Sequence, residues 1–211
     1  MTASAPHRFC HDLRFELGAR LASFDRESCP LDGRIAAAVA VAIVSDDAGN
    51  ACFALTRRAA RLANHGGQWA LPGGRLDSGE TAAAAALREL HEEVGLEAPA
   101  DAVLGLLDDY PTRSGFVITP VVVWGGDDCE LVLDPREVAA AYRVPLDELE
   151  RPGVPRVRRI PESDRPVISI PLVGTHIHAP TAAVIYQFRE VAMHGRATRV
   201  AHFEQPVFAW R

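Results

Sequence analysis

The sequence predicts an α/β protein in which helices flank a mixed β-sheet. Residues 35–44 form a run rich in alanine, valine and isoleucine that has no helix cap and stops at Ser45-Asp46-Asp47, as expected of a strand buried on both faces. Residues 81–93 contain five consecutive alanines, and Gly95 stands where a helix commonly ends. Strand-like and helix-like segments are mixed without a regular alternation, which favours a mixed sheet over a Rossmann arrangement.

The other elements are predicted in chain order from periodicity and turn signals. Apolar residues at helical spacing indicate a helix over residues 10–24. A short helix is expected over residues 145–150, and a closing helix over residues 181–194 with Thr181 as its cap. Strands are expected over residues 51–56, 103–110, 116–124, 137–144 and 167–178. Loops or turns are expected over residues 57–68, 71–74 and 151–166.

Composition narrows the class of protein. The chain has 211 residues, a net charge of −6 and 48% hydrophobic residues, the balance of a soluble globular protein. The longest apolar run is too short to span a bilayer, and residues 1–9 show no secretory signal, so we expect no membrane partner. Four scattered cysteines without a CxxC pair suit a reducing cytoplasm, and the acidic balance argues against nucleic-acid binding.

Three glutamates share one face of the predicted alanine-rich helix. Glu89, Glu92 and Glu93 stand at i, i+3 and i+4, where like charges repel, and they lie near the negative end of the helix dipole. Arg88 is expected to point to a different part of the helix surface. A divalent cation such as Mg²⁺ or Mn²⁺ would compensate these charges, with a carbonyl of the Pro72-Gly73-Gly74 turn as a further ligand. A solvated acidic face is the alternative interpretation of the three glutamates alone.

The surrounding residues resemble the signature of the Nudix hydrolase family, GX5EX7REUXEEXGU, in which U is a bulky aliphatic residue. All nine defined positions match at the required spacing, namely Gly74, Glu80, Arg88, Glu89, Leu90, Glu92, Glu93, Gly95 and Leu96. The resemblance implies a Nudix-type α/β/α sandwich around a mixed β-sheet. It places the Nudix core at residues 34–150, after an N-terminal extension with a helix (1–33). Residues 151–211 would form a strand and helix extension packed on the core or at a homodimer interface.

The resemblance also implies roles for the signature residues. Glu89 and Glu93 would be the principal metal ligands, and Glu92 a further ligand or the group that orients the attacking water. Arg88 would orient the carboxylates by ion pairing. Glu80 would support the loop or a second metal, and the Gly73/Gly74 backbone would supply a carbonyl. The reaction would be hydrolysis of a nucleoside diphosphate linked to another group, with Glu89 and Glu92 as alternative general bases.

The segment upstream of the signature resembles the coenzyme A pyrophosphatase branch, whose motif is LLTxR(S/A)x3Rx3Gx3FPGG. The matching residues are Leu55, Thr56, Arg58, Ala59, Gly67, Pro72, Gly73 and Gly74, whereas Ala54, Ala63 and Leu71 depart from it. This resemblance implies cleavage of coenzyme A or acyl-CoA to 3′,5′-ADP and phosphopantetheine. The residues expected to bind substrate are Arg57, Arg58, Arg61, His65 and Gly73.

Two other functions stay open at this stage. An ADP-ribose or other nucleoside diphosphate pyrophosphatase is the alternative substrate class, and a proline shortly after the signature, Pro111, fits it. A non-catalytic nucleotide-sensing module is the alternative from another class.

Further along the chain, His176 and His178 alternate on a predicted strand, so they point to the same face and could contact phosphate. Arg156, Arg158 and Arg159 form a basic patch that could attract an anionic substrate, with a solvated loop as the alternative.

Overall fold

The computed structural model describes residues 7–61, 66–126 and 130–209. Its helices are α1 (His11–Ala22), α2 (Ala82–Val94) and α3 (Thr181–Phe188), which continues as a π-helical turn over Arg189–Met193. Short 3₁₀ helices cover Ala100–Ala102, Leu146–Glu150 and Val207–Ala209. The strands are β1 (Ile35–Ser45), β2 (Ala51–Arg58), β3 (Trp69–Ala70), β4 (Gly73–Arg75), β5 (Val103–Leu106), β6 (Tyr110–Pro111), β7 (Phe116–Gly126), β8 (Val138–Pro145), β9 (Arg156–Ile160), β10 (Ser163–Leu172) and β11 (Thr175–His178).

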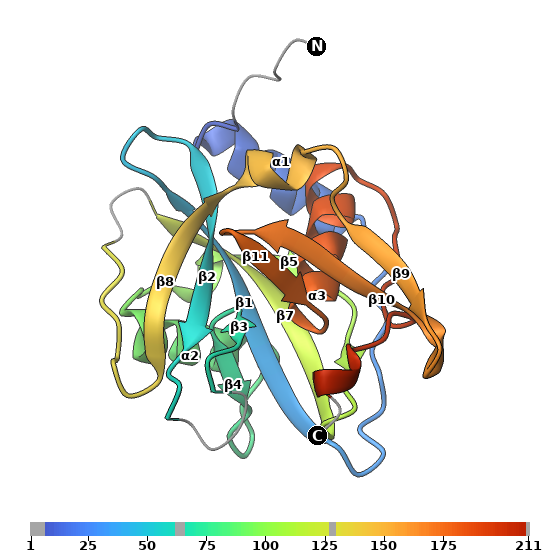
Figure 1. The fold of residues 1–211 in the computed structure, drawn as a ribbon. Helices are drawn as coiled ribbons and strands as arrows, with labels where there is room; N and C mark the ends of the chain where they lie inside the picture. Colours follow the sequence, from blue (N-terminus) through green and yellow to red (C-terminus); the bar gives the residue numbers. More distant parts are fainter. Residues whose placement is uncertain (1–6, 62–65, 127–129, 210–211) are drawn as a thin grey trace.

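The main sheet is mixed, as predicted, and β1 lies at its centre (Figure 1). Strand β1 pairs with β7 in parallel and with β2 and β4 in antiparallel fashion. Beyond β2 lie β3 and β8, and beyond β7 lie β5 and β6. The segment predicted as one strand over residues 103–110 is therefore two short strands, β5 and β6, that both pair with β7.

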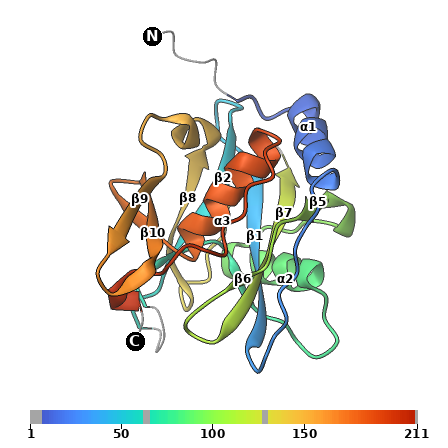
Figure 2. The same ribbon diagram turned by 90° about the vertical axis from the view of Figure 1, so that its right-hand side faces the viewer.

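The two faces of the sheet bury different side chains. On one face Ala38, Ala40 and Ala42 of β1 pack in the same cluster as Ala85 and Ala86 of α2. On the other face lies a larger cluster to which β1, α1 and α3 contribute (Figure 2). Because alanine carries only a methyl group, the alanine run lets α2 approach the sheet closely, and this positions the end of α2 beside β4.

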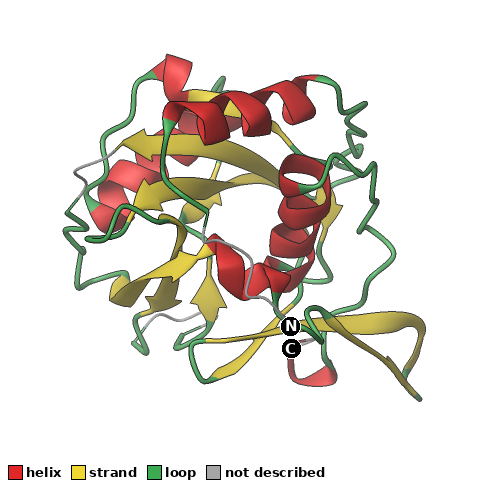
Figure 3. Cartoon of the chain, turned by 90° about the horizontal axis from the view of Figure 1, so that it is seen from above, coloured by secondary structure: helices red, strands yellow, loops and turns green. Residues whose placement is uncertain are grey.

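The prediction of a loop over residues 151–166 is wrong. Strands β9 and β10 form an antiparallel hairpin there, and β11 completes a second, three-stranded sheet. Figure 3 shows this hairpin extending past the helices at one corner of the molecule. The arginines that suggested a loop are instead exposed on β9, an edge strand, and Pro166 lies where the β9–β10 register shifts.

Three smaller expectations also need correction. Thr181 is the first residue of α3 rather than its cap, because its hydroxyl donates to the Trp69 carbonyl at 3.3 Å instead of capping the helix. Of the segment expected to be a turn, Leu71 and Pro72 lie between β3 and β4, whereas Gly73 and Gly74 begin β4 and pair with β1. Arg57 and Arg58 belong to β2 rather than to the following loop.

Both ends of the described chain pack on the core. Phe9 stacks on Trp124 with ring centroids 4.0 Å apart, and Leu17 and Leu21 of α1 are buried. Near the other end Phe203 and Glu204 are buried, whereas Phe208 is exposed. Within the described residues, no helix has the length and apolar character needed to cross a membrane.

The buried Glu204 makes acid stability testable. Arg113 donates to both Glu204 oxygens at 2.9 and 2.6 Å, and these bonds lower the pKa of Glu204 from 4.5 to about 2. Because the folded-state pKa is depressed, the stabilisation is present above about pH 4.5 and is lost as the pH falls towards 2. We expect Glu204→Gln to show a smaller fall in unfolding free energy between pH 6 and pH 3 than the parent, measured by urea titration. The exposed Glu162→Gln variant is the control; parallel pH curves for Glu204→Gln and the parent would contradict the assignment.

Candidate active site

Helix α2 is capped at both ends, which fixes its last turn. The Thr81 hydroxyl accepts a hydrogen bond from the Ala84 amide at 3.2 Å, and Gly95 ends the helix in the left-handed conformation at φ 69°. The three signature glutamates then differ sharply in environment. The side chain of Glu93 is 3% exposed and that of Glu89 13%, whereas that of Glu92 is 55% exposed. Two of the three carboxylates therefore face the sheet rather than solvent.

The glycine turn, which is Gly73 and Gly74 at the start of β4, touches the carboxylates of both Glu89 and Glu93. A Cβ on Gly74 would overlap the carboxylate of Glu89, so only glycine fits this position. The Gly73 amide donates a hydrogen bond to the carboxylate of Glu93. Gly73 also needs to be glycine, because a Cβ there would overlap the backbone of Ala38 and Val39 in β1 and prevent β4 from pairing with β1.

Burial makes the charged forms of the Glu89 and Glu93 carboxylates unfavourable, and the nearby arginines do not fully compensate. Desolvation raises the pKa of Glu93 to about 8, although Arg58 lies 3.5 Å away, and it raises the pKa of Glu89 in spite of Arg88. Neighbouring negative charges add to this effect. The charge of Glu89 raises the pKa of Glu93, and the charge of Glu92 raises the pKa of Glu89. A cation held between Glu89 and Glu93 would relieve this cost.

Arg88 does not point away from the carboxylates, contrary to the expectation from its position. Its guanidinium donates to both oxygens of Glu80 at 3.0 Å, to Glu89 at 2.8 Å and to Glu92 at 3.0 Å. Its long side chain folds back along the helix and reaches all three groups. Glu80 also accepts from the Asp77 amide at 2.9 Å, so both of its oxygens are engaged in holding the loop before α2.

A further carboxylate, which the sequence did not single out, lies at the edge of this cluster. Glu137 is exposed just before β8, and its charge raises the pKa of both Glu89 and Glu93. The loop that carries it is fastened to α2, because the Asp134 amide donates to the Glu93 carbonyl at 3.1 Å. The only sequence signal for Glu137 was its place as an acidic residue at the start of a predicted strand. Its position near Glu89 and Glu93 depends on the pairing of β8 with β2.

The donor set fits a hard divalent cation. Glu89 and Glu93 offer buried carboxylate oxygens beside a glycine turn, which is the oxygen-rich chemistry that Mg²⁺ and Mn²⁺ prefer. Within the described ranges, no three acidic, histidine or cysteine side chains converge as a complete metal cage, because Glu92 turns outward to Arg88. The remaining ligands would be backbone carbonyls and water, as is usual for Mg²⁺.

The residues predicted to bind substrate do not all act alike. Arg58 lies in the carboxylate cluster, and Arg61 donates to the Pro135 carbonyl at 2.8 Å and so braces the loop that carries Glu137. Arg57 is exposed on β2. His65 and Ala63, the position where the coenzyme A motif has an arginine, lie outside the described residues.

The aromatic residues near the site differ in their surroundings. Tyr110 is buried and donates to the Phe203 carbonyl at 2.9 Å, so it belongs to the core. Trp69 packs against Tyr142, which is 40% exposed, with ring centroids 5.2 Å apart. This pair on β3 and β8 offers an aromatic surface beside Arg57, and Tyr142 was not predicted.

Comparisons with known proteins identify the family. The sequence model of the NUDIX domain matches residues 34–163, and the chain therefore belongs to the Nudix family. The match extends past residue 150 into the β9–β10 hairpin, and the division into three regions stays a prediction.

Curated relatives carry the same family name. Nudix hydrolase 3 from Caenorhabditis elegans is 37% identical over 122 residues, which cover 56% of this chain and 50% of that protein. The uncharacterized Nudix hydrolase NudL from Enterobacter sp. (strain 638) is 41% identical over 98 residues, which cover 46% of this chain and 51% of that protein. The chain thus spans about half the length of these relatives. A MutT/nudix family protein from Enterococcus faecalis has a similar fold, with a TM-score of 0.51 and 15% identity over 77% of this chain and 63% of that one.

Proposed function

We propose that the chain is a Mg²⁺- or Mn²⁺-dependent pyrophosphohydrolase of nucleoside diphosphate derivatives, with coenzyme A or acyl-CoA as its substrate. The observation that carries the general activity is the pair of carboxylates set against Gly73 and Gly74, with the Glu93 side chain 3% exposed and that of Glu89 13% exposed. Retention of every signature glutamate argues against a non-catalytic sensing module, which has no need for buried carboxylates that are costly to ionise.

Each residue has a role that follows from its contacts. Glu89 and Glu93 would hold the cation, and Gly74 leaves the space in which Glu89 lies. When bound, the cation neutralises the diphosphate oxygens and lowers the pKa of a water. Arg88 is a positioning residue, since it holds Glu89 through a direct hydrogen bond while Glu80 anchors it from the loop.

Three carboxylates are candidates for the general base. Glu89 and Glu92 were expected from the signature, and Glu137 joins them because it is exposed and close enough to perturb Glu89 and Glu93. Glu92 accepts from Arg88 at 3.0 Å, so its orientation is restrained, whereas no hydrogen bond is seen to the Glu137 carboxylate from the described part of the chain. We therefore favour Glu137 as the group that accepts a proton from the attacking water.

The motif upstream of the signature supports coenzyme A as substrate. Arg58 and the Gly73-Gly74 turn, two features of that motif, both lie at the carboxylate pair. Pro111, which favoured ADP-ribose, lies in β6 opposite Val117, and its place at a short strand next to a turn has an ordinary backbone explanation.

A substrate panel with Mg²⁺ or Mn²⁺ tests this proposal. We expect coenzyme A to yield 3′,5′-ADP, detected by chromatography, faster than ADP-ribose yields AMP. The reverse order would establish the alternative substrate class. No turnover of any diphosphate, with nucleotide binding retained, would reject catalysis and favour the sensing module.

A further inference from the structure

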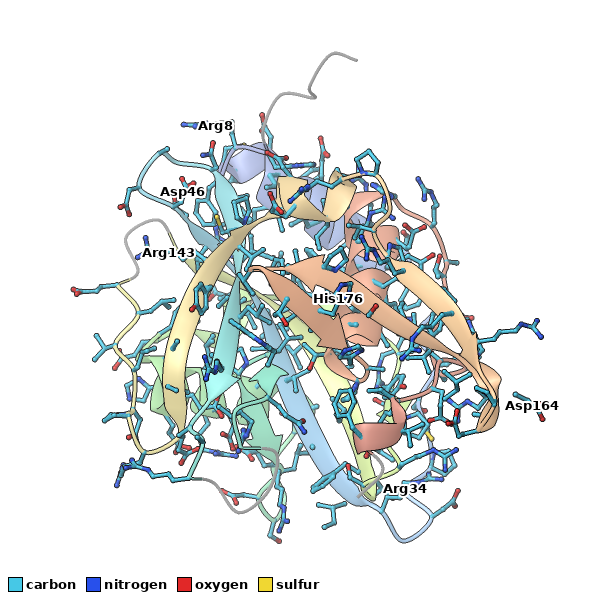
Figure 4. The ribbon with its side chains drawn as sticks, in the orientation of Figure 1. Arg8, Arg34, Asp46, Arg143, Asp164 and His176 are labelled. Carbon is cyan, nitrogen blue, oxygen red and sulfur yellow. The ribbon has the colours of Figure 1, made fainter. Side chains whose placement is uncertain are left out.

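One face of the second sheet forms an open hollow that the proposed chemistry does not use. Its volume is about 680 Å³, and polar side chains of all three strands line it, namely Arg156, Arg158, Ser169, His176 and His178. Figure 4 labels His176 on β11, between the strands of the main sheet and the β9–β10 hairpin.

Strand register explains why these five side chains meet. Ser169 of β10 lies opposite Arg156 of β9 and opposite His178 of β11, which makes a row across the sheet. Arg158, opposite Val167, and His176, opposite Pro171, stand two residues to either side of this row and point to the same face. Residues of the opposite face, Ile168, Ile170 and Ile177, are buried in the core. On the polar face, the ring of Phe208 packs edge-on against His178, with ring centroids 5.3 Å apart.

The hollow carries positive charge without a visible counter-charge. Within the described ranges, neither Arg156 nor Arg158 makes an ion pair or hydrogen bond through its side chain. The Nδ1 atom of His178 is buried and has no hydrogen-bond partner there. Burial lowers the pKa of His178, and the neighbouring His176 and Arg158 lower it further. A bound anion would supply the missing charge and a hydrogen-bond partner.

The start of α3 contacts β3, which lies next to the active site in the chain. His178 is followed by two residues and then Thr181, whose hydroxyl donates to the carbonyl of Trp69 on β3. Trp69 lies four residues before Gly73, at the carboxylate pair. This hydrogen bond from Thr181 holds the start of α3 against β3, the strand that precedes Gly73 and Gly74.

We propose that Arg156, Arg158, Ser169, His176 and His178 bind a phosphate monoester group of the substrate, apart from the diphosphate that is cleaved. Two guanidinium groups with a hydroxyl and imidazoles match the several oxygens and the double charge of such a group. This inference rests on the proposed function and deepens it. The upstream coenzyme A motif has an arginine where this chain has Ala63, which cannot bind phosphate, and the arginines of the second sheet would make a phosphate contact in its place.

The test uses two substrates that differ by one phosphate, coenzyme A and 3′-dephospho-coenzyme A. The double variant Arg156→Gln/Arg158→Gln should raise the KM for coenzyme A by about tenfold or more, because charge-assisted hydrogen bonds are lost. Its kcat and its KM for the dephospho compound should stay unchanged. Arg159→Gln is the matched control, because Arg159 is an exposed arginine of β9 that points to the other face.

Three results would overturn the proposal. The first is an equal KM change for both substrates, and the second is no change for either. The third combines two observations: the parent binds inorganic phosphate and the double variant does not, and the parent has the same KM for both substrates. That result would show a site for the free phosphate ion instead. If the parent hydrolyses neither substrate, the proposed function fails by itself. Tighter binding of 3′,5′-ADP than of AMP by the parent, lost in the double variant, would still support the phosphate site, and equal binding of the two would reject it.

Discussion

The Glu93→Gln variant is expected to lose turnover by about 10²–10³-fold while folding as the parent does. Glu93 lies at the end of α2 with its side chain 3% exposed, and its carboxylate faces the Gly73 amide. An amide has the same shape and can accept the same hydrogen bond, but it lacks the charge needed to hold a divalent cation. Because burial disfavours a charge at this position, the neutral side chain should not reduce the melting temperature.

The measurement compares kcat/KM and thermal unfolding for the parent, Glu93→Gln and Glu97→Gln. Glu97 follows α2 closely, and its side chain is 84% exposed, so the same change there should leave both quantities unchanged. Near-normal turnover in Glu93→Gln would reject its assignment as a metal ligand. A lost activity accompanied by a large fall in melting temperature would show a structural role instead.

Gly74→Ala is expected to lower kcat/KM by about 10–100-fold, the loss typical when a group that orients a metal ligand is disturbed. The added Cβ would occupy the space of the Glu89 carboxylate and displace it from the turn. The backbone carbonyl of residue 74 remains in the variant, so the loss would report the position of Glu89.

The control for this change is Gly18→Ala in α1, where an added Cβ meets no atom within 4 Å. That variant should retain full activity and gain roughly 0.5–1 kcal/mol in the free energy of unfolding, because alanine favours a helix. Full activity of Gly74→Ala, measured alongside it, would show that Glu89 does not need its observed position.

The strands and helices with strong local patterns were predictable from the sequence. The apolar run of β1 and the alanine run of α2 appear within one or two residues of their predicted limits, because burial on both faces and helix propensity act locally. The β9–β10 hairpin was not predictable in the same way. Its exposed arginines and prolines are typical of a loop, and only pairing with β11 and packing against α3 make the segment a sheet.

The active site was likewise predictable only where the sequence signal is local. The spacing of Glu89, Glu92 and Glu93 placed them on one helix face, but spacing alone did not show that Glu92 turns outward while Glu93 is buried. The folding back of Arg88 and the approach of Glu137 depend on contacts between segments distant in sequence, through Glu80 and through the β2–β8 pairing. Such contacts leave no periodic signal in the sequence.

The central claim is that Glu89 and Glu93 hold a divalent cation against the glycine turn. Anomalous diffraction from a crystal soaked in Mn²⁺ tests it most directly. We expect a peak between these two carboxylates and the Gly73-Gly74 backbone, with oxygen ligands at about 2.0–2.2 Å, and no such peak in Glu93→Gln. A peak elsewhere, or none at this position in the parent protein at saturating Mn²⁺, would contradict the claim.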